Sequence, residues 1–156
     1  MTAMVKPIPD GYEHATPYLI ISGAAGAMDF YARAFGAAEV LRLAMGDGRI
    51  GHAEVRIGRA SIMLADEFPD MGYRGPRALG GSPVSVHIYV EDVDALAGRA
   101  AAAGATVKRP VQDQFYGDRS VTLEDPFGHV WTFATRKEDV PPEELRKRHA
   151  ATFGAA

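Results

Sequence analysis

The stretch FYARAFGAAEV, residues 30–40, decides the fold, because the chain repeats it in similar form as LAGRAAAAGATV at residues 96–107. Both pieces are typical of the end of a helix that a glycine terminates, followed by the start of a strand. A second pair lies further along, where IGRASIMLA at 57–65 matches FGHVWTFA at 127–134. Because an internal repeat fixes the architecture, the sequence predicts two copies of one module.

The first copy runs in the order strand, helix and three further strands. A strand over 16–22 leads into a helix whose apolar side chains recur at spacings of three and four, and Ser22 is a plausible N-cap for this helix. Gly36 is a natural residue to end it, because glycine accepts the left-handed conformation. Three strands then come after the helix, the first two joined by the turn signal GDG, over 38–45, 49–57 and 60–67.

The second copy repeats this order. A strand over 84–90 precedes a helix for which Asp92 is the candidate N-cap and Gly104 the terminating glycine. Three strands again come after the helix, over 106–111, 119–125 and 129–135.

The repeat also sets the expected boundaries. We expect a single domain over residues 1–156, with module one at about 15–67, a linker at 68–83, module two at about 84–136 and a C-terminal helix at about 140–153. The linker is rich in glycine and proline, and a loop of this length is either a crossover connection or a functional lid.

The composition of the chain limits the classes of function. Its 156 residues are 47% hydrophobic and 24% charged, with a net charge of −3 and no cysteine. This mild acidity gives no support to a nucleic-acid partner, and the lack of cysteine excludes disulfides, thiolate nucleophiles and sulfur-ligated zinc. We see no signal peptide and no apolar run that could span a membrane, so we expect a cytoplasmic protein without a membrane partner.

Three passages resemble motifs of the vicinal oxygen chelate superfamily, which includes glyoxalase I, the bleomycin-resistance proteins, fosfomycin-modifying enzymes and extradiol dioxygenases. AMDFYARAFGA resembles the helix of its first module, VSVHIYVEDVDAL the start of its second, and QFYGDRSVTLEDPFGHVWTFAT its closing hairpin. The last passage, together with HAEV and MLADEFP, is most similar to the PhnB-like branch. The resemblance covers roughly residues 15–137.

The resemblance implies an α+β fold in which each module forms a curved mixed sheet. The two sheets wrap a cup that holds a small-molecule ligand, and a C-terminal helix comes after them. The resemblance also implies a homodimer. Metal-using members of the superfamily take one metal ligand from the first and the last strand of each module.

Those four ligand positions fall on unsuitable residues in this chain. Carried over by motif, they correspond to Thr16, to Ile62 or Met63, to Ser85 and to Thr132. Zinc and iron need imidazole or carboxylate donors, which these residues do not supply. We therefore expect the usual metal, and any other cofactor, to be absent.

Strand alternation nevertheless gathers polar residues on the surfaces expected to face the cup. His52, Glu54 and Arg56 share one face of their strand, and Ser85, His87 and Tyr89 share one face of another. His52, Glu54 and His87 are the candidate catalytic residues, as acid and base or as hydrogen-bonding groups. Two alternatives stay open: these three residues form a displaced zinc or manganese site, or they satisfy one another and hold the sheets in register.

The tripeptide His52-Ala53-Glu54 has one other interpretation, as the first half of the zinc-deaminase signature. That signature requires a P-C-x-x-C partner, which a chain without cysteine lacks. The deaminase hypothesis therefore fails on the sequence alone.

The candidate ligand-binding residues are Ser85, Tyr89, Phe115, Tyr116 and Thr132. Phe115 and Tyr116 precede a strand and could stack on a planar ligand at the rim of the cup, or could pack within their loop or at a dimer contact. Other residues have structural interpretations: His129 belongs to the DPFGH turn, Trp131 and Phe133 pack under a helix, and Asp118 pairs with Arg119.

Two functions compete. The first is an enzyme that acts on a small molecule by acid–base chemistry, as a lyase, isomerase or conjugating enzyme. The alternative is a non-catalytic protein that sequesters an aromatic or cationic compound, like the bleomycin-resistance members. A role in phosphonate metabolism is disfavoured, because few cations besides Arg56 and Arg119 are expected near the cup.

Overall fold

The computed structural model describes residues 3–156 and contains two four-stranded sheets. The first module has a mixed sheet of strand order β1-β4-β3-β2, in which β1 and β4 are parallel and the other pairs are antiparallel. Its elements are β1 (Tyr18–Ile21), α1 (Ala24–Phe35), β2 (Ala38–Ala44), β3 (Ile50–Ile57) and β4 (Ala60–Asp66).

The second module repeats this topology with the strand order β5-β8-β7-β6. Its elements are β5 (Ser85–Tyr89), α3 (Val93–Ala103), β6 (Thr106–Asp113), β7 (Asp118–Glu124) and β8 (Val130–Arg136). The predicted repeat and the α+β fold class are therefore confirmed, with two open, mixed sheets and a C-terminal helix, α4 (Pro142–Phe153).

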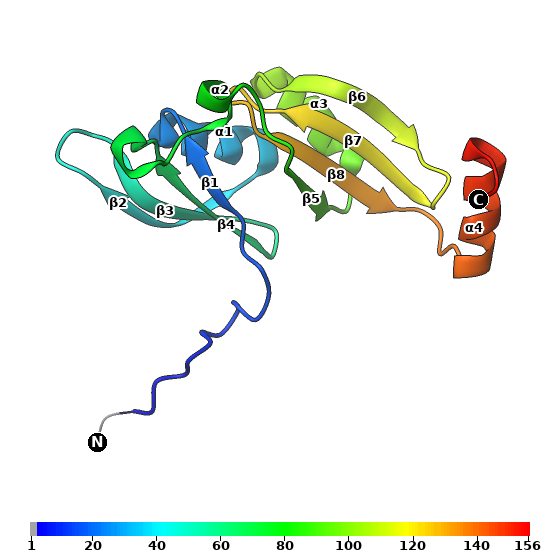
Figure 1. Cartoon of the computed structure of the whole chain (residues 1–156), viewed down its shortest axis with the longest axis horizontal. Coiled ribbons are helices and arrows are strands. Elements are labelled where there is room, and N and C mark those ends of the chain that lie inside the picture. The colour runs from blue at the N-terminus through cyan, green and yellow to red at the C-terminus, as the bar shows by residue number, and fades with distance from the viewer. Residues whose placement is uncertain (1–2) are drawn as a thin grey trace.

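The core lies between the helices and one face of each sheet. Figure 1 shows α1 and α3 beside each other on the same side of the two sheets. Tyr31 and Phe35 of α1 contact Trp131 across the module boundary, with ring centroids 5.2 and 5.0 Å apart. Trp131 and Phe133 are fully buried in this cluster, which confirms that they pack under a helix. A shared aromatic core thus joins the two modules.

The helix ends agree with the sequence, except at the start of α1. Asp92 caps α3 by accepting a hydrogen bond from the Ala95 amide, and left-handed Gly36 and Gly104 end the two helices. The prediction that Ser22 caps α1 is wrong, because Gly23 takes that place with a left-handed backbone. The cap comes instead from Asp66 at the end of β4, a long-range contact that local sequence does not reveal.

The linker contains a 3-10 turn at Pro69–Met71 and one short helix, α2 (Pro76–Leu79). Its first part folds back on itself, because Phe68 and Tyr73 exchange two backbone hydrogen bonds of 2.9 and 3.1 Å. None of the helices in residues 3–156 is long and apolar enough to cross a membrane.

Helix α4 lies at the far end of module two in Figure 1. Its Arg148 pairs with Glu138 at 2.7 Å and donates to the carbonyl oxygen of Phe115. The rings of His149 and Phe153 pack on Phe115. The helix therefore packs on the β6–β7 turn, although none of its residues is buried.

Candidate functional site

The face of the first sheet that lies opposite α1 forms one half of the expected cup, and we call it cup face one. Ala53, Val55 and Ile57 of β3 are buried in the core beneath the helix. His52, Glu54 and Arg56 alternate with them and therefore lie on cup face one, as predicted. Tyr18 and Met63 belong to the same face, because both lie in register with Glu54 across β1, β4 and β3.

Glu54 is the most unusual polar residue of this face, since it is only 3% exposed. The Tyr12 hydroxyl lies 2.7 and 2.6 Å from the two carboxylate oxygens, so its single proton is shared between them. This hydrogen bond from Tyr12 to Glu54 raises the pKa of the Tyr12 phenol, because it favours the protonated form. Glu54 is therefore covered by a residue of the N-terminal segment.

His52 also contacts a tyrosine. The hydroxyl of Tyr18 lies 2.9 Å from His52 Nδ1, and the two ring centroids are 5.5 Å apart. Burial raises the pKa of Tyr18, so its hydroxyl stays protonated at neutral pH. Each predicted catalytic residue of β3 thus carries a tyrosine partner.

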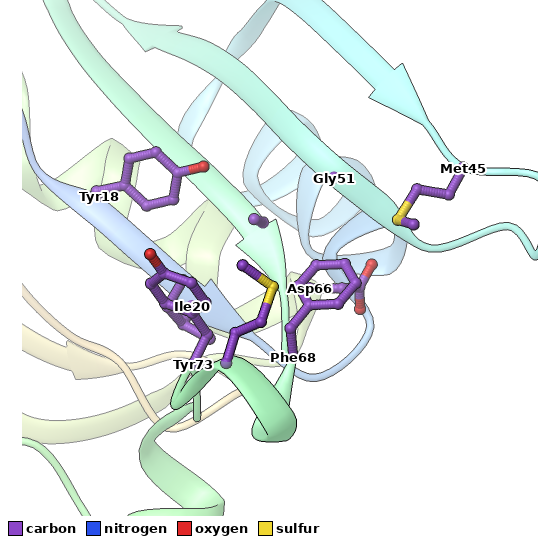
Figure 2. Close-up of a pocket in the computed structure, with 9 residues that line it drawn as sticks. Tyr18, Ile20, Met45, Gly51, Asp66, Phe68 and Tyr73 are labelled. Carbon is purple, nitrogen blue, oxygen red and sulfur yellow. The ribbon is translucent and has the colours of Figure 1, made fainter.

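Next to Tyr18, cup face one contains a cavity of about 700 Å³. Figure 2 shows Tyr18 and Ile20 of β1, Met45 beyond β2, and Phe68 and Tyr73 of the linker around it. Met71, Ala65, Gly51 and Asp66 complete the lining. Aromatic rings and flexible thioethers suit a planar apolar ligand, because rings stack on it and methionine adapts to its shape.

Within residues 3–156, Asp66 is the one charged residue of this lining, but its oxygens are already occupied. One accepts the amides of Gly23 and Ala24 at 2.9 and 3.1 Å, and the other accepts the amide of Ile50 at 2.7 Å. Asp66 therefore orders the start of α1 and of β3 and has little capacity left for acid–base chemistry. The cavity therefore presents mainly apolar surface.

The corresponding face of the second sheet, cup face two, is polar, and several of its side chains bond one another. Ser85, His87 and Tyr89 alternate with Val86, Ile88 and Val90, and Ile88 is buried, as predicted. The preceding Val84 is exposed and does not pack on the helix. Three pairs of side chains on this face are joined by hydrogen bonds: Tyr89 and Asp118 at 2.6 Å, Gln114 and Ser120 at 3.0 Å, and Thr122 and Thr132 at 3.1 Å.

A second cavity, of about 850 Å³, lies between the 57–60 turn and the ends of β5 and β8. His87, Tyr89, Arg59, Glu91 and Arg136 line it, and neither His52 nor Glu54 does. The structure of the single chain therefore places His52 and Glu54 together on β3, where they line neither of these two cavities, and places His87 at the second cavity.

The fold and the sequence together identify the family. The family model for the Glyoxalase/Bleomycin resistance protein/Dioxygenase superfamily matches residues 11–133. The chain belongs to this superfamily. Uncharacterized proteins of Mycobacterium bovis and Mycobacterium tuberculosis are 42% identical to it over 134 residues, which cover 84% of this chain and 88% and 79% of the respective relatives.

Several solved structures have a similar fold. TioX from Micromonospora sp. ML1 is 29% identical with a TM-score of 0.63, and the match covers 80% of this chain and 98% of TioX. The fosfomycin resistance protein FosX from Listeria monocytogenes is 17% identical with a TM-score of 0.60, covering 85% and 96%. A putative 3-demethylubiquinone-9 3-methyltransferase, PhnB protein, from Bacillus cereus is 19% identical with a TM-score of 0.61, covering 79% and 99%. The last two likenesses concern the fold alone.

The superfamily's usual metal does not fit the donors that this chain offers. The register places Met63 on cup face one and buries Ile62 under the helix, so Met63 takes the ligand position that the sequence left open. The quartet is then Thr16, Met63, Ser85 and Thr132, which lacks the imidazole and carboxylate donors that zinc and iron require. Residues 3–156 also contain no cluster of three histidine or acidic side chains placed to hold a metal ion, so His52, Glu54 and His87 do not form one within the single chain.

The other predicted residues lie on cup face two or in turns of module two. Phe115 packs on α4, which favours the loop-packing alternative for this residue, while Tyr116 beside it is 38% exposed. Ser85 is exposed on cup face two, and Thr132 is bonded to Thr122. His129 contacts the carbonyl oxygen of Ile20 at 3.0 Å, which fits a structural role.

One prediction about a charge pair is wrong. Asp118 does not pair with Arg119, because adjacent strand residues point to opposite faces. Arg119 bonds Asp94 and Asp113, whereas Asp118 accepts from Tyr89.

Sequence reasoning missed Tyr12, Tyr18, Phe68 and Tyr73, which contact the candidate residues or line the first cavity. Tyr18 had a usable signal, because strand alternation places it on the same face as Thr16. The other three lie in irregular segments without a period, so their position depends on how those segments fold over the sheet.

Proposed function

We propose that this chain binds a planar, mostly apolar small molecule in the cavity on cup face one, and that binding rather than catalysis is its function. The observation that carries the proposal is the lining of three aromatic rings and two methionines around about 700 Å³. A cavity of this size fits within the range of ordinary small-molecule sites. The linker is then part of the binding site, through Phe68, Met71 and Tyr73.

The proposed absence of catalysis rests on the partners of the polar groups. Asp66 is the one acid of the cavity lining within residues 3–156, and its two oxygens accept three backbone amides. Glu54 does not line this cavity and lies under Tyr12. A general base must lie within reach of the proton it removes, so neither carboxylate is placed to act on a ligand in this cavity.

The test is a titration by isothermal calorimetry with planar aromatic compounds, with quinoline as the first probe. We expect Tyr73→Ala to weaken quinoline binding by about tenfold, because it removes one stacking face, which corresponds to about 1.4 kcal/mol. Tyr116→Ala is the matched control, since Tyr116 has a similar exposure of 38% against 48% for Tyr73 and lies on the other module. Equal loss in both variants, or no binding by the wild type, would contradict the proposal.

A second candidate function is acid–base catalysis, and the pair of Tyr18 and His52 favours it. Tyr18 lines the cavity and its hydroxyl contacts His52 Nδ1, so the pair could move a proton at the edge of a bound ligand. In that case His52→Ala would abolish turnover of a bound lyase or isomerase substrate while leaving its affinity within about threefold. Loss of affinity and turnover together would favour a binding role for His52.

We further propose a homodimer. Strand β2 is an edge strand without a single buried residue, and Leu41, Leu43 and Met45 are 43–54% exposed on or beside it. An edge strand offers unpaired backbone groups to another chain, and apolar side chains gathered beside it favour association. Sedimentation equilibrium is expected to give twice the mass of the chain, and Leu43→Lys is expected to shift the protein toward the monomer.

A further inference from the structure

The N-terminal segment leaves the body of the molecule ahead of β1 (Figure 1). Residues 3–11 are exposed, and the hydrogen bonds of Tyr12 to Glu54 are the ones that join the described residues 3–15 to the sheets. A segment held by so few contacts opens at low cost in free energy. The site on Glu54 can therefore be vacated without unfolding a module.

The chemistry of this contact is specific. A phenol ring lies on cup face one and donates its hydroxyl to a carboxylate that is only 3% exposed, with donor–acceptor distances of 2.6 and 2.7 Å. Tyr12 covers Glu54, so its departure exposes the carboxylate, which then accepts hydrogen bonds from water or from a ligand. A phenolic ligand offers the same donor and the same ring as Tyr12.

The neighbourhood of Glu54 selects among donors. Arg56 lies two residues after Glu54 on the same face of β3. The hydrogen bond to Glu54 raises the pKa of Tyr12, and the positive charge of Arg56 lowers this pKa by a smaller amount. Arg56 offsets part of the negative charge of Glu54, so the site attracts a cation less than a lone carboxylate would. A neutral aromatic hydroxyl has the charge, shape and donor that the site already accommodates in Tyr12.

We propose that Glu54 is a subsite for phenolic ligands that the chain's own Tyr12 occupies until such a ligand displaces it. The proposal rests on the proposed function in one respect, that the ligand lies on cup face one. Tyr12 is then a tethered competitor, held a few residues before Tyr18, and short tethers give effective concentrations of about the millimolar range. Free phenols bind the wild type in competition with it.

The test uses 4-methylphenol, which is the tyrosine side chain itself, and toluene, which lacks the hydroxyl. Both are titrated into the wild type and Tyr12→Ala, and modification of Glu54 by carbodiimide and glycinamide is followed by peptide mass spectrometry. We expect Tyr12→Ala to bind 4-methylphenol at least about tenfold more tightly than the wild type, because the competitor is gone. We also expect Glu54 to be modified faster in the variant and to be protected by 4-methylphenol and not by toluene.

Equal affinity of the two proteins for 4-methylphenol, or equal protection of Glu54 by toluene, would overturn the proposal. Tyr116→Ala serves as the control and is expected to behave as the wild type. If Tyr12→Ala fails to fold, Tyr12→Phe removes the hydroxyl alone, and unchanged modification of Glu54 in that variant would also overturn the proposal. Quinoline binding is measured separately, so a failure of the apolar cavity and a failure of the Glu54 subsite give different results.

Discussion

Cup face one and cup face two are built by the same topology, and they differ in how their side chains are used. On cup face one, rings and methionines line a cavity of about 700 Å³, and the two polar candidates are each held by a tyrosine. On cup face two, the polar side chains of β5, β7 and β8 bond one another across the strands. One module presents a mainly apolar cavity, whereas the other forms several hydrogen bonds among its own polar side chains.

The difference between the two faces arises from the segment of chain that leaves the last strand of each sheet. After β4 the linker folds back over the end of the sheet and adds Phe68 and Tyr73 to cup face one. After β8 the chain leaves the sheet and α4 packs on the β6–β7 turn instead. A duplicated fold can therefore carry an asymmetric site, because the connections between strands differ even where the strands match.

The largest effect is expected at Asp66, which supports cup face one. Asp66→Ala leaves the amides of Gly23, Ala24 and Ile50 without their acceptor, at a cost of roughly 3 kcal/mol or more in the free energy of unfolding. Asp66→Asn keeps one acceptor oxygen and is expected to lose about half as much. Urea denaturation measures both, and a loss below about 1 kcal/mol in Asp66→Ala would show that the three bonds do not order the site.

The next effect is smaller and falls on cup face two: Tyr89→Phe is expected to destabilise the fold more than Tyr18→Phe does. Tyr89→Phe removes the donor to Asp118, which is 3% exposed and whose other oxygen accepts no hydrogen bond from residues 3–156, so we expect a loss of about 1–3 kcal/mol. Tyr18→Phe removes a more exposed bond to His52 and is expected to cost less than about 1 kcal/mol. If Tyr18→Phe proves the more damaging variant, the division between a paired face and an open face is wrong.

The smallest effect concerns pH. The hydrogen bond to Asp118 raises the pKa of Tyr89 above its ordinary value of 10.0. The folded state then holds this proton more tightly than the unfolded state, so the contribution of Tyr89 is complete below about pH 10 and declines as the pH rises through the raised pKa. The difference in unfolding free energy between the wild type and Tyr89→Phe should therefore be constant below about pH 10 and shrink as the pH rises further. A difference that grows with pH would contradict the assignment of this bond.

The sequence predicted the repeat, the strands and the faces of β3 and β5, because these depend on local periods of two and 3.6 residues. Strand alternation placed His52 and Glu54 on the sheet face opposite α1, but not their relation to His87, which lines the second cavity while His52 and Glu54 line neither cavity. The cap of α1 and the lining by Phe68 and Tyr73 depend on contacts between distant segments. Such contacts depend on how a whole module packs, and no local pattern encodes them.

The position of the ligand on cup face one is the central claim. Amide chemical shifts measured by heteronuclear NMR during a titration with quinoline test it most directly. We expect the largest shifts at Ile20, Gly51, Ala65 and Tyr73, which line the first cavity, and small shifts at His87 and Tyr89. Shifts concentrated at His87, Tyr89 and Arg136 would place the ligand at the second cavity and contradict the claim.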